Sequence, residues 1–85
     1  MHNESIPAAD LCSAMHERIE AALPGATVEV TGGGGHFEIR VVSSAFEGLN
    51  TLKKQRLVYS AIKDLMAGDS APVHAIDRMI TEVPS

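Results

Sequence analysis

Residues 27–41 read TVEVTGGGGHFEIRV, and this stretch decides the fold. Polar and apolar residues alternate over Thr27–Thr31 and again over His36–Val41, as they do in strands that bury one face. The four glycines at 32–35 would join the two runs as a short, flexible loop. The stretch therefore predicts an antiparallel β-hairpin whose buried side begins with Phe37.

Helical patterns lie on both sides of the hairpin. Apolar residues recur at spacings of three and four over Ala8–Leu23, and Pro24-Gly25 would end that helix. A second pattern of this kind covers Thr51–Met66, with Asn50 as its N-cap. A last run, Val73–Ile80, predicts a third strand.

The predicted order is thus helix, strand, strand, helix, strand. Because a strand–helix–strand crossover normally joins parallel neighbours, the third strand should lie parallel to the second. We expect an α+β fold, a three-stranded mixed sheet with both helices on one face and the other face wet. Residues 8–82 form a single domain in this interpretation, with a disordered segment at 1–7, a tail at 83–85 and a helical turn within 43–48.

Composition narrows the classes of function. The chain has 85 residues, four histidines and one cysteine, Cys12, so neither an internal disulfide nor a cysteine-only zinc site can form. The net charge of −4 weighs against a dedicated nucleic-acid binder. No apolar run approaches the roughly 18 residues of a membrane span, and the first residues do not resemble a signal peptide. We therefore expect a cytoplasmic adaptor or binding module rather than an enzyme.

His36 and His74 are the candidate metal ligands. If the last two strands are parallel, both strand starts fall at the same edge of the sheet, and the two imidazoles could face one site. Two histidines leave a transition metal under-coordinated, which is typical of a site that another molecule completes. The alternative is that each is a surface or hydrogen-bonded residue at a strand end.

Other side chains with chemical potential are scattered. Cys12 lies near the apolar stripe of its helix, as a small core residue would, and His16 follows one turn later without an acid to orient it. Asp64, Asp69 and Asp77 are not arranged in a motif that pairs carboxylates for acid–base catalysis. The sequence thus contains no recognisable catalytic set.

The second helix carries a basic cluster, formed by Lys53, Lys54, Arg56 and Lys63. Such a cluster is most often a solvated face, and the alternative is contact with an acidic partner or with nucleic-acid phosphate. The glycines at 32–35 match the spacing G-x-x-G, yet they join two strands and no lysine or arginine flanks them. The glycine run is therefore interpreted as a hairpin tip.

Several stretches together resemble the BolA family. They are HFEIRVVSSAFEGL at 36–49, LKKQRLVY at 52–59, VHAI at 73–76 and Thr81, and the resemblance extends over about residues 11–82. The form K-K-Q-x-x-V-Y is most similar to the bacterial IbaG (YrbA) branch. The resemblance implies a class II KH-like fold in the element order derived above.

The resemblance also implies a partner and a cofactor. Members of the family bind monothiol glutaredoxins of the CGFS type and share a [2Fe-2S] cluster with them, in iron–sulfur trafficking or iron regulation. The glutaredoxin cysteine and a glutathione thiol hold one side, and the family's C-terminal histidine, matched by His74, holds the other. The family adds a ligand from the loop between the first two strands, where this chain offers only His36. The isolated chain is not expected to hold the cluster.

The same resemblance leaves a second function open. A KH-like fold together with the basic cluster would suit a nucleic-acid-binding transcriptional regulator. Formation of a weak homodimer is a further alternative. The sequence does not decide whether His36 is a ligand or a structural residue.

Overall fold

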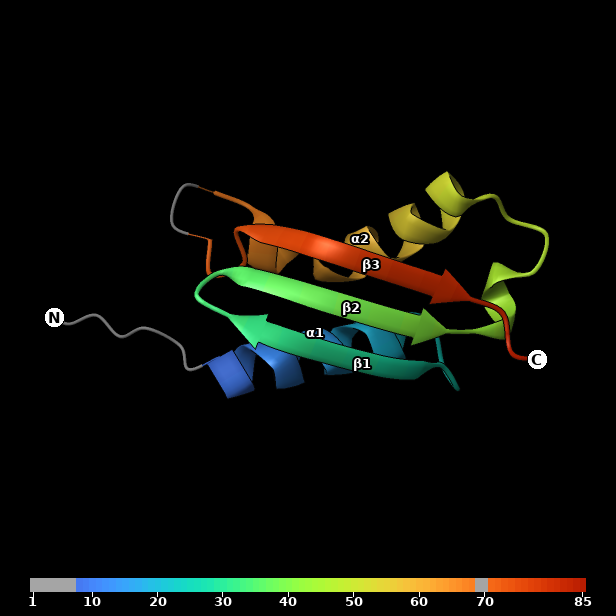
Figure 1. Ribbon diagram of the computed structural model, residues 1–85, viewed down its shortest axis with the longest axis horizontal. Helices are drawn as coiled ribbons and strands as arrows, with labels where there is room; N and C mark the ends of the chain where they lie inside the picture. Colours follow the sequence, from blue (N-terminus) through green and yellow to red (C-terminus); the bar gives the residue numbers. More distant parts are fainter. Residues whose placement is uncertain (1–7, 69–70) are drawn as a thin grey trace, which may run out of the picture.

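The computed structural model describes residues 8–68 and 71–85, so the segment 1–7 that was predicted to be disordered lies outside the described residues. The elements are α1 (Ala8–Ala22), β1 (Thr27–Gly33), β2 (His36–Val42), the 3-10 helix η1 (Ser44–Phe46), α2 (Thr51–Met66) and β3 (Ala75–Glu82). The strands form one sheet in the order β1-β2-β3, with β1 antiparallel and β3 parallel to β2. Both helices lie against one face of this sheet, and the other face is open (Figure 1). The predicted α+β fold is confirmed.

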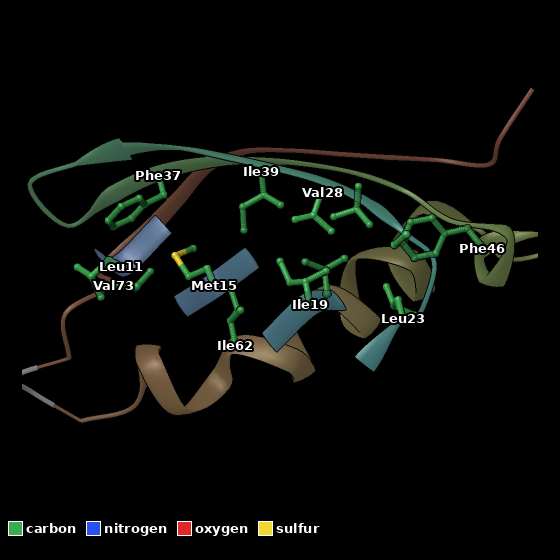
Figure 2. Packing of buried hydrophobic residues seen from close by; sticks show 13 residues of the cluster. Leu11, Met15, Ile19, Leu23, Val28, Phe37, Ile39, Phe46, Ile62 and Val73 are labelled. Carbon is green, nitrogen blue, oxygen red and sulfur yellow. The ribbon is translucent and has the colours of Figure 1, made fainter. Parts of the chain in front are cut away.

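The core fills the space between the helices and the sheet (Figure 2). Side chains of β2 at alternate positions point into it, as the period of a strand requires. Spacings of three and four residues bring the apolar stripes of the helices to meet them. The fully buried side chains that make this contact are Met15, Ile19, Phe37, Ile39, Val41, Val58 and Ile62.

The hairpin turn is shorter than the sequence suggested. β1 continues into the glycine run, where Gly33 still pairs with His36. Only Gly34 and Gly35 form the turn, and both have positive φ, at 64° and 85°. A two-residue hairpin turn of type I′ requires such angles at both positions, and glycine adopts them without steric cost. The expected four-residue loop is therefore wrong in length.

The last strand begins later than predicted. The expected strand started at Val73 and ended at Ile80, whereas β3 covers Ala75–Glu82. Val73 is buried, and its N–H donates to the carbonyl oxygen of Leu65 in α2 at 3.1 Å. Its backbone is thus held by the helix rather than by the sheet, and pairing with β2 starts only after it.

The second helix has the bounds that the sequence predicted. It begins after Asn50, whose Oδ1 accepts a hydrogen bond from the backbone N–H of Lys53 at 2.9 Å. This bond satisfies one of the N–H groups that the first turn of a helix leaves free. Within residues 8–68 and 71–85, neither α1 nor α2 combines the length and apolarity that a transmembrane helix needs.

Candidate functional site

The N-terminal ends of β2 and β3 meet at one end of the sheet. His36 is the first residue of β2, and its register partner is Ala75, the first residue of β3. His74 therefore lies just before β3 and not inside a strand as predicted. The backbone N–H groups of His74 and Ala75 both donate to the carbonyl oxygen of Gly35, at 2.8 and 3.0 Å. The parallel pairing thus brings the two candidate histidines to the same end of the sheet.

The ring of His74 lies directly over Gly35. A Cβ added to Gly35 would come within 2.9 Å of His74 Cδ2, so any side chain at this position would displace the ring. His74 is nevertheless exposed, and it borders a cavity of about 210 Å³ that is also lined by Met66 and Val73. The structure therefore holds the backbone of His74 in place while leaving its imidazole accessible.

His36 has different surroundings. It alternates with the buried Phe37, so its side chain is on the open face of the sheet, where it is 60% exposed. Its Nδ1 lies 3.1 Å from Oδ1 of Asp77 in β3, whose side chain is 55% exposed. Sequence reasoning missed this partner, because 41 residues separate it from His36 and only the register of the parallel strands brings the pair together.

The side-chain donors of the described residues do not gather into a complete metal site. Across the described residues, no group of three or more His, Cys, Asp or Glu side chains could hold a metal ion. Cys12 is half-buried on α1 and lines a separate hollow together with His16 and Val30. A [2Fe-2S] cluster takes four protein-type ligands, of which this end of the sheet offers two imidazoles. His36 lies beside Asp77 and His74 lies beside Met66 and Val73, so a cluster held here would need its remaining ligands from another molecule.

The basic cluster is on α2. Lys53, Arg56 and Lys63 are exposed, whereas Lys54 is half-buried. None of the four takes part in an ion pair within the part of the chain that the structure describes. The exposed apolar side chains Leu52, Leu57 and Tyr59 lie on the same helix. Sequence reasoning identified the cations but did not predict that these apolar neighbours are exposed. Their exposure could have been predicted, because they fall outside the apolar stripe of α2.

Comparisons with known proteins agree with this architecture. The sequence model of the BolA-like protein family matches residues 11–82. An uncharacterised protein from the rpoN–murA intergenic region of Acinetobacter guillouiae is 38% identical over 60 residues, which is 71% of this chain and 70% of that protein. The acid stress protein IbaG of Escherichia coli K12 is 35% identical over 49 residues, or 58% of this chain and 56% of its own length.

Mammalian relatives and solved structures extend the comparison. Human BolA-like protein 1 is 35% identical over 74 residues, which cover 75% of this chain, and the chain spans about half, 52%, of that relative's length. The solution structure of BolA1 from Mus musculus superimposes with a TM-score of 0.72 at 33% identity, over 99% of this chain and 73% of that one. BolA1 from Arabidopsis thaliana superimposes with a TM-score of 0.72 at 26% identity, over 86% of this chain and 90% of that one, and both structures have the same order of helices and strands as this chain.

Proposed function

The chain belongs to the BolA-like protein family, and we propose that it acts there as a non-enzymatic adaptor. In this proposal it binds a monothiol glutaredoxin of the CGFS type and shares a [2Fe-2S] cluster with it, in cluster trafficking or iron regulation. His74 is the main ligand from this chain and His36 the second. The glutaredoxin cysteine and a glutathione thiol supply the other side.

The geometry of His74 carries the proposal. Its backbone N–H donates to Gly35 at 2.8 Å, and its ring has a glycine beneath it, yet the side chain is exposed. An exposed histidine with a fixed backbone can coordinate a metal centre that a second protein also ligates. Because the backbone is already fixed, less conformational entropy is lost when His74 binds a ligand.

The chemistry of the donors supports a shared, transferable cluster. Imidazole ligation makes such a cluster less negative than thiolate ligation does and raises its reduction potential, as in Rieske centres. His74 must be neutral to donate its lone pair, so binding through it is favoured when the ring is deprotonated. With its ligands divided between two proteins, the site opens when the proteins separate, which suits delivery.

The test is a titration of the glutaredoxin-bridged heterodimer followed by visible absorption and circular dichroism. We expect His74→Ala to alter the cluster spectrum and shorten the lifetime of the bridged species. His16→Ala is the matched control, because His16 is also partly exposed, at 40%, but lies on α1. An unchanged spectrum and lifetime in His74→Ala would contradict the proposal.

A second function rests on the basic cluster of α2. Lys53, Arg56 and Lys63 are exposed cations on one helix of a KH-like fold, and such side chains contact phosphates in nucleic-acid complexes. The net charge of −4 opposes this function. A gel-shift series in increasing salt separates the two proposals. Absence of a shift at low salt would exclude nucleic acid, whereas binding that Arg56→Ala and Lys63→Ala weaken would support it.

A further inference from the structure

The contact between His36 and Asp77 is not explained by stability. Both side chains are more than half exposed, and exposed pairs of this kind contribute little to the free energy of folding. The contact nevertheless involves one defined nitrogen, because Nδ1 of His36 is the atom that lies 3.1 Å from Oδ1 of Asp77. The geometry thus selects between the two nitrogens of the ring.

A neutral imidazole has one nitrogen that donates and one that accepts, and its hydrogen-bond partner decides which is which. An ionised carboxylate only accepts, so the neutral ring next to Asp77 must donate through Nδ1–H. Nε2 then keeps its lone pair. In metal sites, carboxylates bonded in this way to the far nitrogen of a histidine fix its tautomer and orientation and raise its basicity.

Asp77 lies at an irregularity in the sheet. Phe37 pairs with Ile76 and Glu38 pairs with Arg78, so Asp77 is an extra residue without a partner in β2. A bulge of this kind bends a strand locally and re-aims the side chain that it carries. Asp77 thus has no residue opposite it in β2, and its side chain contacts His36, the first residue of that strand.

From these observations we infer that Asp77 is a positioning residue, which holds His36 with Nδ1 protonated and Nε2 presented as the metal-binding atom. The inference rests on the proposed function in one respect, namely that His36 acts as the second ligand from this chain. It assigns a role to a carboxylate that itself touches no metal. It also explains how His36, at the start of β2, serves as a ligand in a chain whose glycine turn offers no ligand side chain.

The first experiment needs no cluster. Long-range ¹H–¹⁵N NMR of the isolated chain, at a pH where the ¹⁵N shifts report a neutral ring, gives the tautomer of His36. We expect the Nδ1–H form to predominate in the wild type and to become the minor form in Asp77→Ala. Asp77→Asn should restore it in part, because the amide oxygen still accepts a hydrogen bond. Asp64→Ala is the control, since Asp64 is a similarly exposed carboxylate that pairs with Arg18 instead.

The second experiment uses the reduced, glutaredoxin-bridged heterodimer and pulsed EPR, which detects nitrogen ligands by their ¹⁴N coupling. We expect His36→Ala to remove one coupling and Asp77→Ala to weaken or shift the same one, with the unfolding midpoint unchanged. A tautomer that does not respond to Asp77→Ala overturns the positioning role, whatever the cluster shows. A tautomer that responds, with nitrogen couplings that His36→Ala leaves intact, overturns instead the proposal that His36 is a ligand.

Discussion

The two ends of β2 lie at opposite ends of the sheet (Figure 1) and differ in what surrounds their buried side chains. At the closed end, comprising residues 43–46 and Glu82, Phe46 is fully buried and the N–H of Ser43 donates to Glu82 at 2.9 Å. At the histidine end, comprising residues 34–36 and 74–77, both imidazoles are exposed. Both ends therefore contain fully buried side chains, Phe46 at one and Phe37 at the other, and the difference is that only the histidine end also exposes two imidazoles.

The largest effect should come from the closed end. Phe46→Ala empties a site that is 0% exposed, so we expect a loss of about 3–5 kcal/mol in the free energy of unfolding. His74→Ala at the histidine end should change it by no more than about 0.5 kcal/mol, because the side chain is exposed. Urea denaturation measures both values, and equal losses would remove the contrast between the two ends.

A smaller effect is expected in the turn of the histidine end. Gly34→Ala and Gly35→Ala both force alanine to positive φ, at a cost of about 1–2 kcal/mol each. A Cβ at Gly34 meets no atom within 4 Å, whereas one at Gly35 meets the ring of His74. Gly35→Ala should therefore cost more and should also shift the NMR signals of the His74 ring. If Gly34→Ala perturbs that ring equally, the contact with Gly35 is not what positions it.

Ser43→Ala probes a single hydrogen bond at the closed end. Ser43 is buried, and its Oγ accepts from the N–H of Ala45 at 3.1 Å, which caps the 3-10 helix. Its loss should reduce the free energy of unfolding by about 1 kcal/mol, since an N-cap bond disappears. Ser44→Ala is the control, because Ser44 is exposed. Identical urea midpoints for the two variants would show that the cap contributes nothing.

The smallest effect concerns an ion pair away from both ends. Arg18 in α1 and Asp64 in α2 approach to 2.9 Å, and both side chains are partly exposed. A double-mutant cycle with alanine at each position should give a coupling of about 0.2–1 kcal/mol that declines as salt is added. A coupling as large as the effect of Phe46→Ala would mean that surface charge, and not the closed end, dominates stability.

Much of the fold could be predicted because its signals are local. The alternation over 36–41 and the spacing over 51–66 each depend on neighbouring residues, and the N-cap at Asn50 is recognisable from the residue type alone. The boundary of β3 could not be predicted in this way. The predicted strand began at Val73, yet the N–H of Val73 donates to the carbonyl oxygen of Leu65 in α2, and no local pattern reveals such a contact between elements.

The candidate site was predictable only in part. The helical crossover predicted that the second and third strands are parallel, and parallel pairing places their starts, and with them His36 and His74, at one end of the sheet. The bulge that leaves Asp77 without a strand partner has no local signature in the sequence. The pair of Asp77 and His36 therefore emerged only with the register of β2 and β3.

By itself, the sequence determined the family, through its motifs, and also the order of the elements and the residues that face the core. The elements and the core could be predicted because the spacing of apolar residues along the chain reflects which side chains are buried. The tertiary structure alone decided that the ring of His74 rests on Gly35 and that His36 turns its Nδ1 toward Asp77. Both contacts join strand ends that are about 40 residues apart in the chain. Such contacts depend on register to within one residue, and register is set by the packing of the whole sheet against its helices.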